Sequence, residues 1–188
     1  MSEFGETASR ILGEIGECLK RVSPEKVDCA LDEIARAPRI FAAGAGRSGV
    51  AIRGFANRLM HLGHPVHVVG EISTPSITAK DLLIIGSGSG RTESLVAMAG
   101  KAKKVGARIL LLTIDPQSPI GTLADLVIEI PAPSPKATDA ARAIKSIQPL
   151  GSLFEQSLFV LFDTLVVLLM RKGNIGFESM FQRHANLE

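Results

Sequence analysis

Between residues 39 and 130 the sequence alternates short, mostly apolar runs with longer segments of helical periodicity. Runs that are apolar on both faces are typical of parallel strands, because helices cover both sides of such a sheet. The pattern therefore predicts an α/β fold, a doubly wound five-stranded parallel sheet between two layers of helices. The predicted elements are strands at 40–43, 66–69, 81–85, 109–113 and 126–130, helices at 49–62 and 92–105, and a short turn or helix at 118–123.

Five strands in this rhythm favour the flavodoxin-like order 2-1-3-4-5. In that order the first and third strands are neighbours, and the chain reverses direction between them, which opens a crevice at their carboxyl ends. A glycine-rich loop follows each of these two strands, at 44–49 and at 87–94. Both loops are therefore expected to face one crevice.

The second glycine-rich loop has the layout of an anion site. Glycines let its backbone turn sharply, and Ser87, Ser89 and Thr92 can donate hydrogen bonds. The helix that follows adds unpaired N–H groups and the positive end of its dipole. Turn-forming serines and an N-cap threonine are the alternative without a ligand, but three hydroxyls exceed what capping requires. The loop predicts a phosphate site, and it lacks the lysine of an ATP-hydrolysing P-loop.

The first loop, G-A-G-R-S-G at 44–49, matches the dinucleotide pattern G-x-G-x-x-G. Glu71 follows the second strand, where a ribose partner would be expected, so a nicotinamide-dependent oxidoreductase is an alternative. Arg47 and Ser48 argue against it, because close approach to a pyrophosphate requires neither a charge nor a hydroxyl there. A second anion site is also more than a dinucleotide needs. A tight turn without a ligand is the other alternative.

Glu155 lies at the start of a long apolar helix predicted at 152–172. A buried carboxylate is costly unless it is paired or used, so Glu155 is a candidate general base beside a helix dipole. A first-turn carboxylate facing water is the alternative. Asp163, deeper in the same apolar run, is a second candidate for a buried carboxylate, with a salt-bridge partner as its default explanation.

Composition restricts the partners. A formal charge of +2 and the absence of Trp and Tyr argue against nucleic-acid binding. The apolar run at 158–170 is too short for a bilayer span and contains an aspartate, and no signal pattern opens the sequence, so a cytoplasmic protein is expected. Cys18 and Cys29 lie in helix-like sequence without metal-type spacing, and both are expected to be free, buried thiols. Three histidines fall on a helix end, a turn and a strand: His61, His64 and His67. Ligands on such different elements would not converge, so no metal site is predicted.

The ends of the chain add further elements to one predicted domain, 1–188. Two helices are predicted within residues 1–37, where a minimal α/β unit offers them little to pack on. We expect them to form part of an interface between subunits, with packing inside the chain as the alternative. Residues 131–149, which include Lys136, Arg142 and Lys145, form a long irregular connection, and such connections are usually functional or mobile.

Taken together, the two loops resemble those of the sugar isomerase (SIS) domain family. The stretches 58–63, 148–156 and 184–188 narrow this resemblance to the members that isomerise hexulose phosphates, and it covers almost the whole chain. The resemblance implies interconversion of D-arabino-3-hexulose 6-phosphate and D-fructose 6-phosphate through an enediolate, with no redox cofactor. It also implies a homo-oligomer, a dimer or tetramer, whose subunit contacts complete the sites.

The resemblance implies roles for particular residues. Glu155 would act as the base, and His184 would shuttle hydroxyl protons, in its own subunit or from a neighbouring one. Apart from the resemblance, the charge of Arg47 in the first loop makes it a candidate to stabilise developing oxyanion charge. A non-catalytic sugar-phosphate sensor of the same family is the alternative; sensors typically carry a DNA-binding segment, and none is visible. The phosphate would be held by one serine of the first loop and the whole of the second: Ser48, Ser87, Gly88, Ser89, Gly90, Arg91 and Thr92.

Overall fold

The sheet has the predicted strand order. In the computed structural model, which describes residues 2–133 and 145–187, five parallel strands lie in the order β2-β1-β3-β4-β5. Along β1 and β3 the register runs from Ile40 opposite Leu82 to Gly44 opposite Gly86, so the two strands end side by side. The strands are β1 (Ile40–Gly44), β2 (Val66–Val68), β3 (Leu82–Gly86), β4 (Arg108–Thr113) and β5 (Leu126–Glu129).

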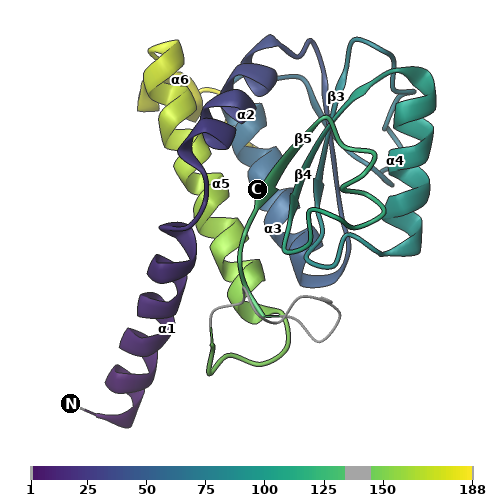
Figure 1. Cartoon of the computed structure of the whole chain (residues 1–188). Helices are drawn as coiled ribbons and strands as arrows, with labels where there is room; N and C mark the ends of the chain where they lie inside the picture. The colour runs from purple at the N-terminus through teal and green to yellow at the C-terminus, as the bar shows by residue number, and fades with distance from the viewer. Residues whose placement is uncertain (1, 134–144, 188) are drawn as a thin grey trace.

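Helices cover both faces of this sheet, which confirms the three-layer α/β fold (Figure 1). Alternate residues of β3 enter different cores: Leu82 and Ile84 pack with α3 and α5, whereas Leu83 and Ile85 pack with α4. Because successive side chains of a strand point to opposite faces, a strand that is apolar throughout must be covered on both. The helices are α1 (Glu3–Leu19), α2 (Pro24–Arg36), α3 (Gly46–His61), α4 (Glu93–Val105), α5 (Ser152–Gly173) and α6 (Phe177–Phe181).

The two N-terminal helices pack differently along their length. The buried face of α2 lies in the core, and α1 buries Ile15 and Cys18 near its C-terminal end. Packing inside the chain therefore accounts for α2 and half of α1. The N-terminal turns of α1 extend past the rest of the molecule, where Phe4 and Leu12 are exposed (Figure 1). That these turns meet another subunit stays a prediction.

Several local predictions were wrong. Helix α3 begins at Gly46 rather than residue 49, because the chain turns at Gly46 with φ +56° and enters the helix at once. Helix α5 runs to Gly173, one residue past the predicted end at 172, because the left-handed residue that stops it is Asn174, at φ +50°. Asp163 is exposed, since it lies one helical turn from the exposed Phe159 and Val167.

Helix α5 is long and apolar enough to cross a membrane by length and composition alone, with a mean hydropathy of 1.9. Half of the 18-residue stretch over which this mean is taken is buried inside the protein, where the inner face of α5 packs against α3 and α1. This packing is that of the core helix that the sequence predicted. Both thiols are free as predicted, and Cys18 is buried, but the prediction that Cys29 is buried was wrong, because Cys29 lies on the exposed side of α2. Of the predicted irregular connection, Lys136 and Arg142 lie outside the described residues.

Candidate functional site

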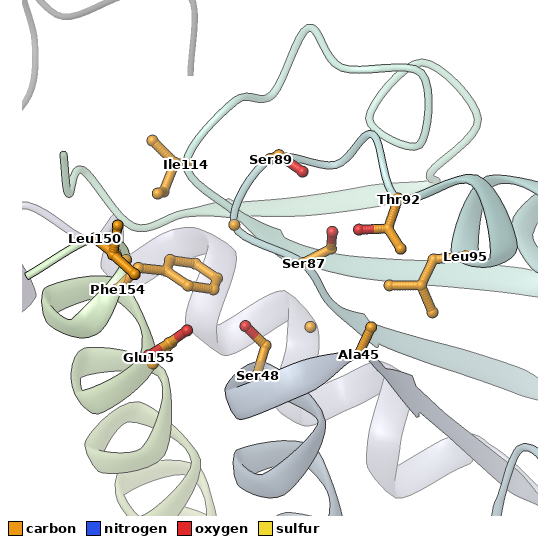
Figure 2. Close-up of a pocket in the computed structure, with 13 residues that line it drawn as sticks. Ala45, Ser48, Ser87, Ser89, Thr92, Leu95, Ile114, Leu150, Phe154 and Glu155 are labelled. Carbon is orange, nitrogen blue, oxygen red and sulfur yellow. The ribbon is translucent and has the colours of Figure 1, made fainter. Parts of the chain in front are cut away.

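A cavity of about 340 Å³ lies at the carboxyl ends of β1 and β3 (Figure 2). The two glycine-rich loops form one side of it, and the start of α5 forms the other. The crevice that the strand order implies is therefore present. Its lining residues are Ala45, Ser48, Gly86, Ser87, Gly88, Ser89, Thr92, Leu95, Ile114, Leu150, Gly151, Phe154 and Glu155.

Three helices begin at this cavity. Its lining includes the N-cap residues of α3, α4 and α5, which are Ala45, Thr92 and Gly151, and none of them caps its helix with a side-chain hydrogen bond. Away from the cavity, Ser2 caps α1 and Ser23 caps α2, whereas the five-residue α6 also begins without a side-chain cap. Uncapped helix starts leave N–H groups unpaired and carry positive partial charge. Three of them facing one space favour an anionic ligand.

Hydroxyl groups beside these helix starts are also unused. Among the described residues, no hydrogen bond involves the hydroxyl of Ser48, Ser87 or Thr92, and Ser87 is only 4% exposed. Figure 2 shows the Thr92 oxygen directed towards Ser87, and the Ser48 oxygen beside Glu155. Ser89 accepts a hydrogen bond from the backbone N–H of Arg91 at 3.3 Å. Hydroxyls that are enclosed but unpaired are suited to donate to phosphate oxygens.

The second loop is held by the end of β4 and by the chain that follows it. The carbonyl of Gly88 accepts from the N–H of Ile114 and from the hydroxyl of Thr113, each at 3.0 Å, and the carbonyl of Gly90 accepts from the N–H of Ile120 at 3.2 Å. Gly90 has φ +59°, and a Cβ atom there would lie 2.0 Å from the Oγ of Ser118. Gly90 is therefore needed for the turn and for packing, and it does not line the cavity.

Glu155 bridges the starts of two helices. Its carboxylate on α5 forms an ion pair with the Nε of Arg47 on α3, and its side chain is 20% exposed. Arg47 is 67% exposed and is absent from the cavity lining, so it reaches the site through this carboxylate. Glu155 is neither fully buried nor simply facing water. An ion-paired carboxylate at the edge of a cavity can accept a proton from a bound molecule.

Two predicted site residues lie elsewhere in this chain. The guanidinium of Arg91 pairs with Asp115 at 2.8 Å, which leaves Arg91 outside the lining. His184 stacks on His61, with 5.2 Å between ring centroids, in a groove beside α6. Because α6 follows the C-terminus of α5 and Glu155 lies near its N-terminus, about 30 Å separates the two ends of this 22-residue helix. Within one chain, His184 does not reach the cavity.

The sequence analysis did not predict the apolar residues that line the cavity. Phe154 is 1% exposed and packs against Gly88, and Leu150 covers one end of the cavity with φ +54°. The sequence could have identified Phe154, because it directly precedes the candidate base Glu155. Nothing in the sequence marks Leu150, because no local pattern predicts a leucine in a left-handed conformation. Glu71, the expected ribose partner, pairs instead with Arg53 at 3.4 Å and does not line the cavity. In the parts of the chain that are described, no group of three or more His, Cys, Asp or Glu could hold a metal.

Comparisons with known proteins agree with this geometry. The SIS domain model matches residues 33–160. The chain is 47% identical over 183 residues to the 3-hexulose-6-phosphate isomerase of Bacillus subtilis, covering 97% of this chain and 98% of that protein. It is 45% identical over 180 residues to the enzyme of the same name from Mycobacterium gastri, covering 96% and 89%. A crystal structure from Methanococcus jannaschii, for which that function was inferred, superposes with a TM-score of 0.85 at 34% identity, covering 97% and 99%.

Proposed function

Since the chain belongs to the SIS domain family, we propose that it is a 6-phospho-3-hexuloisomerase, which interconverts D-arabino-3-hexulose 6-phosphate and D-fructose 6-phosphate. One observation carries the proposal. In a single cavity, three uncapped helix starts and unpaired hydroxyls lie opposite an ion-paired carboxylate. The first group suits a phosphate, and the second suits proton transfer on the carbon chain attached to it.

The phosphate would lie in the second loop. Ser87 and Thr92 would donate their hydroxyl protons to its oxygens, and the N–H groups at the start of α4 would donate alongside them. Ser48 would donate from the start of α3. Since the phosphate is remote from the reacting carbons, its binding energy serves to orient the sugar. The apolar wall that includes Phe154 excludes water from the opposite side.

Glu155 would transfer the proton between carbons. In the 3-ketose, the hydrogen on C2 is acidic because the neighbouring C3 is a carbonyl. The carboxylate removes this hydrogen, the electron pair forms the C2–C3 double bond, and negative charge moves to the oxygen on C3. The carboxylic acid then returns the proton to C3 while the oxygen on C2 loses its own proton and becomes the carbonyl. Arg47, already paired with Glu155, is placed to stabilise the charge that develops on oxygen.

The hydroxyl protons must also move between the two oxygens. Within this chain His184 is too distant, so its assignment requires the C-terminal end of another subunit to reach the cavity. The exposed apolar residues that a second copy would cover lie on α1, α5 and α6: Phe4, Leu12, Phe159, Val160, Val167, Phe177 and Phe181. A homo-oligomer in the cytoplasm, with His184 supplied in trans, is part of the proposal.

Removing the unpaired hydroxyls is expected to weaken substrate binding. We expect Ser87→Ala and Thr92→Val each to raise KM for fructose 6-phosphate about tenfold, because each loses one hydrogen bond to a charged group. The value of kcat should change by less than about threefold, since the carboxylate is untouched. Steady-state kinetics measure both. Thr122→Val is the matched control, because the Thr122 hydroxyl bonds to the carbonyl of Pro119 outside the cavity. If Ser87→Ala and Thr92→Val had the same KM as Thr122→Val and the wild type, the phosphate would not bind at these two hydroxyls.

The reaction itself can be observed directly. Fructose 6-phosphate incubated with the purified protein in D₂O should yield the 3-ketose, detected by ¹³C NMR. Whenever the protonated Glu155 exchanges its proton with solvent before returning it to carbon, deuterium enters C2 of the product and C3 of recovered fructose 6-phosphate. Binding without conversion would indicate a sensor instead. A thermal shift with NAD(P) but none with hexose phosphates would favour the oxidoreductase, whose expected ribose partner Glu71 pairs with Arg53.

A further inference from the structure

One wall of the cavity is tied to a helix that does not line it. Residues 146–151, here called the strap, precede α5, and the carboxylate of Glu14 on α1 accepts three hydrogen bonds from them. The donors are the Ser146 hydroxyl at 2.6 Å, the Ile147 N–H at 3.0 Å and the Gln148 side-chain amide at 3.1 Å. The Glu14 side chain is only 11% exposed, and the Nε of Arg10 lies 3.7 Å from Oε1, the oxygen that also accepts from Ile147.

The strap in turn contacts both α5 and the cavity. The side-chain oxygen of Gln148 accepts from the amide of Gln156 at 2.7 Å, and Gln156 directly follows Glu155 on α5. At its far end the strap places Leu150 and Gly151 in the cavity wall. Two hydrogen bonds therefore connect Glu14 to the turn that carries the proposed base.

The negative charge of Glu14 strengthens its hydrogen bonds to the strap. Burial raises the pKa of the Glu14 carboxyl, but the hydrogen bonds from Ser146, Ile147 and Gln148, together with the charge of Arg10, outweigh it and leave the pKa below its ordinary value. Glu14 is thus ionised at neutral pH, and its hydrogen bonds are charge-assisted. Leu150, with φ +54°, holds a conformation that non-glycine residues keep only where their surroundings impose it.

We propose that Glu14 is a positioning residue of this active site, holding the strap so that Leu150 and Gly151 close the cavity around the sugar phosphate. The role goes beyond attaching α1 to the domain, since Ile15 and Cys18 already bury that helix against the core. Its kinetic consequences rest on the proposed isomerase function, but the position of the strap does not.

Glu14→Gln tests the assignment. The amide keeps the size of the side chain but offers one acceptor oxygen, so the three strap donors cannot all be satisfied. We expect KM for fructose 6-phosphate to rise about tenfold and kcat to stay within about threefold, with hydrogen exchange of residues 146–151 about tenfold faster. Glu17→Gln is the matched control, because Glu17 on the same helix is exposed and pairs only with Lys20 among the described residues. It should change none of these.

The outcomes separate the two proposals. Faster strap exchange in Glu14→Gln alone, in a protein whose wild type shows no isomerase activity, would support the strap assignment and remove the proposed function. Unchanged exchange and KM in a folded Glu14→Gln variant would overturn the assignment. A rise in KM that appears equally in Glu17→Gln, or that only follows a fall in melting temperature, would also overturn it. Glu14→Asp, which keeps the charge, should recover part of the loss in KM.

Discussion

Glu155→Gln is expected to lower kcat for hexulose phosphate isomerisation by about a thousandfold, with KM changed less than about threefold. Glutamine has nearly the same shape, and its oxygen can still accept a hydrogen bond from Arg47, so the cavity should keep its form. The amide nitrogen cannot accept the proton that leaves carbon, so the enediolate does not form at an appreciable rate. Stopped-flow or coupled-enzyme kinetics give kcat, and calorimetry with fructose 6-phosphate gives the binding constant.

The matched control for this change is Glu71→Gln. Glu71 is also a partly exposed carboxylate in an arginine pair, with Arg53 at 3.4 Å, but it lies outside the cavity lining. It should retain wild-type kcat. If Glu155→Gln kept kcat within about tenfold of wild type, Glu155 would not be the base. If Glu155→Gln lost substrate binding together with turnover, the Glu155 carboxylate would act in binding the substrate rather than in proton transfer.

Gly90→Ala is expected to lower the free energy of unfolding by about 3 kcal/mol, which combines a strained positive φ with overpacking. A Cβ at Gly90 would lie 2.0 Å from Oγ and 2.5 Å from Cβ of Ser118, and Ser118 is fully buried. The turn can only shift outwards, which moves the neighbouring Ser89 and Thr92 away from the cavity. Denaturant unfolding should therefore show reduced stability, and kinetics should show a raised KM in the fraction that stays folded.

Gly100→Ala provides the comparison, because a Cβ there meets nothing within 4 Å and the residue lies inside α4. In a helix interior, alanine is favoured over glycine by about 0.5–1 kcal/mol, so this variant should be as stable as wild type or slightly more so. Gly90→Ala with unchanged stability and KM would mean that the second loop is far more adaptable than its hydrogen bonds indicate.

Features that depend on local pattern and on parallel topology were predictable from the sequence. The strand order and the meeting of the two loops followed from apolar strands alternating with helices, and α4 ends at Val105 as expected. Glu155 stood out because a carboxylate opens an apolar helix. The ion pair of Glu155 with Arg47 could not be predicted, because Arg47 is 108 residues away in the sequence and no local pattern marks the pair.

The prediction that Asp163 is buried was wrong because it judged burial by the composition of the surrounding run. Asp163 lies in an apolar run, yet helical geometry puts it on the outer face of α5. Glu14 shows the reverse, since a carboxylate on an amphipathic helix is expected to face solvent and here it binds a segment more than 130 residues away. A pattern of residue types along one helix carries no information about which distant segment covers it.

The most direct test of the account is a crystal structure of Glu155→Gln with fructose 6-phosphate bound. We expect the phosphate within hydrogen-bond distance of the Ser87 and Thr92 hydroxyls, with C2 and C3 of the sugar against the side chain at position 155. A phosphate bound in the groove beside His61 and His184, or a carbon chain directed away from position 155, would contradict the account.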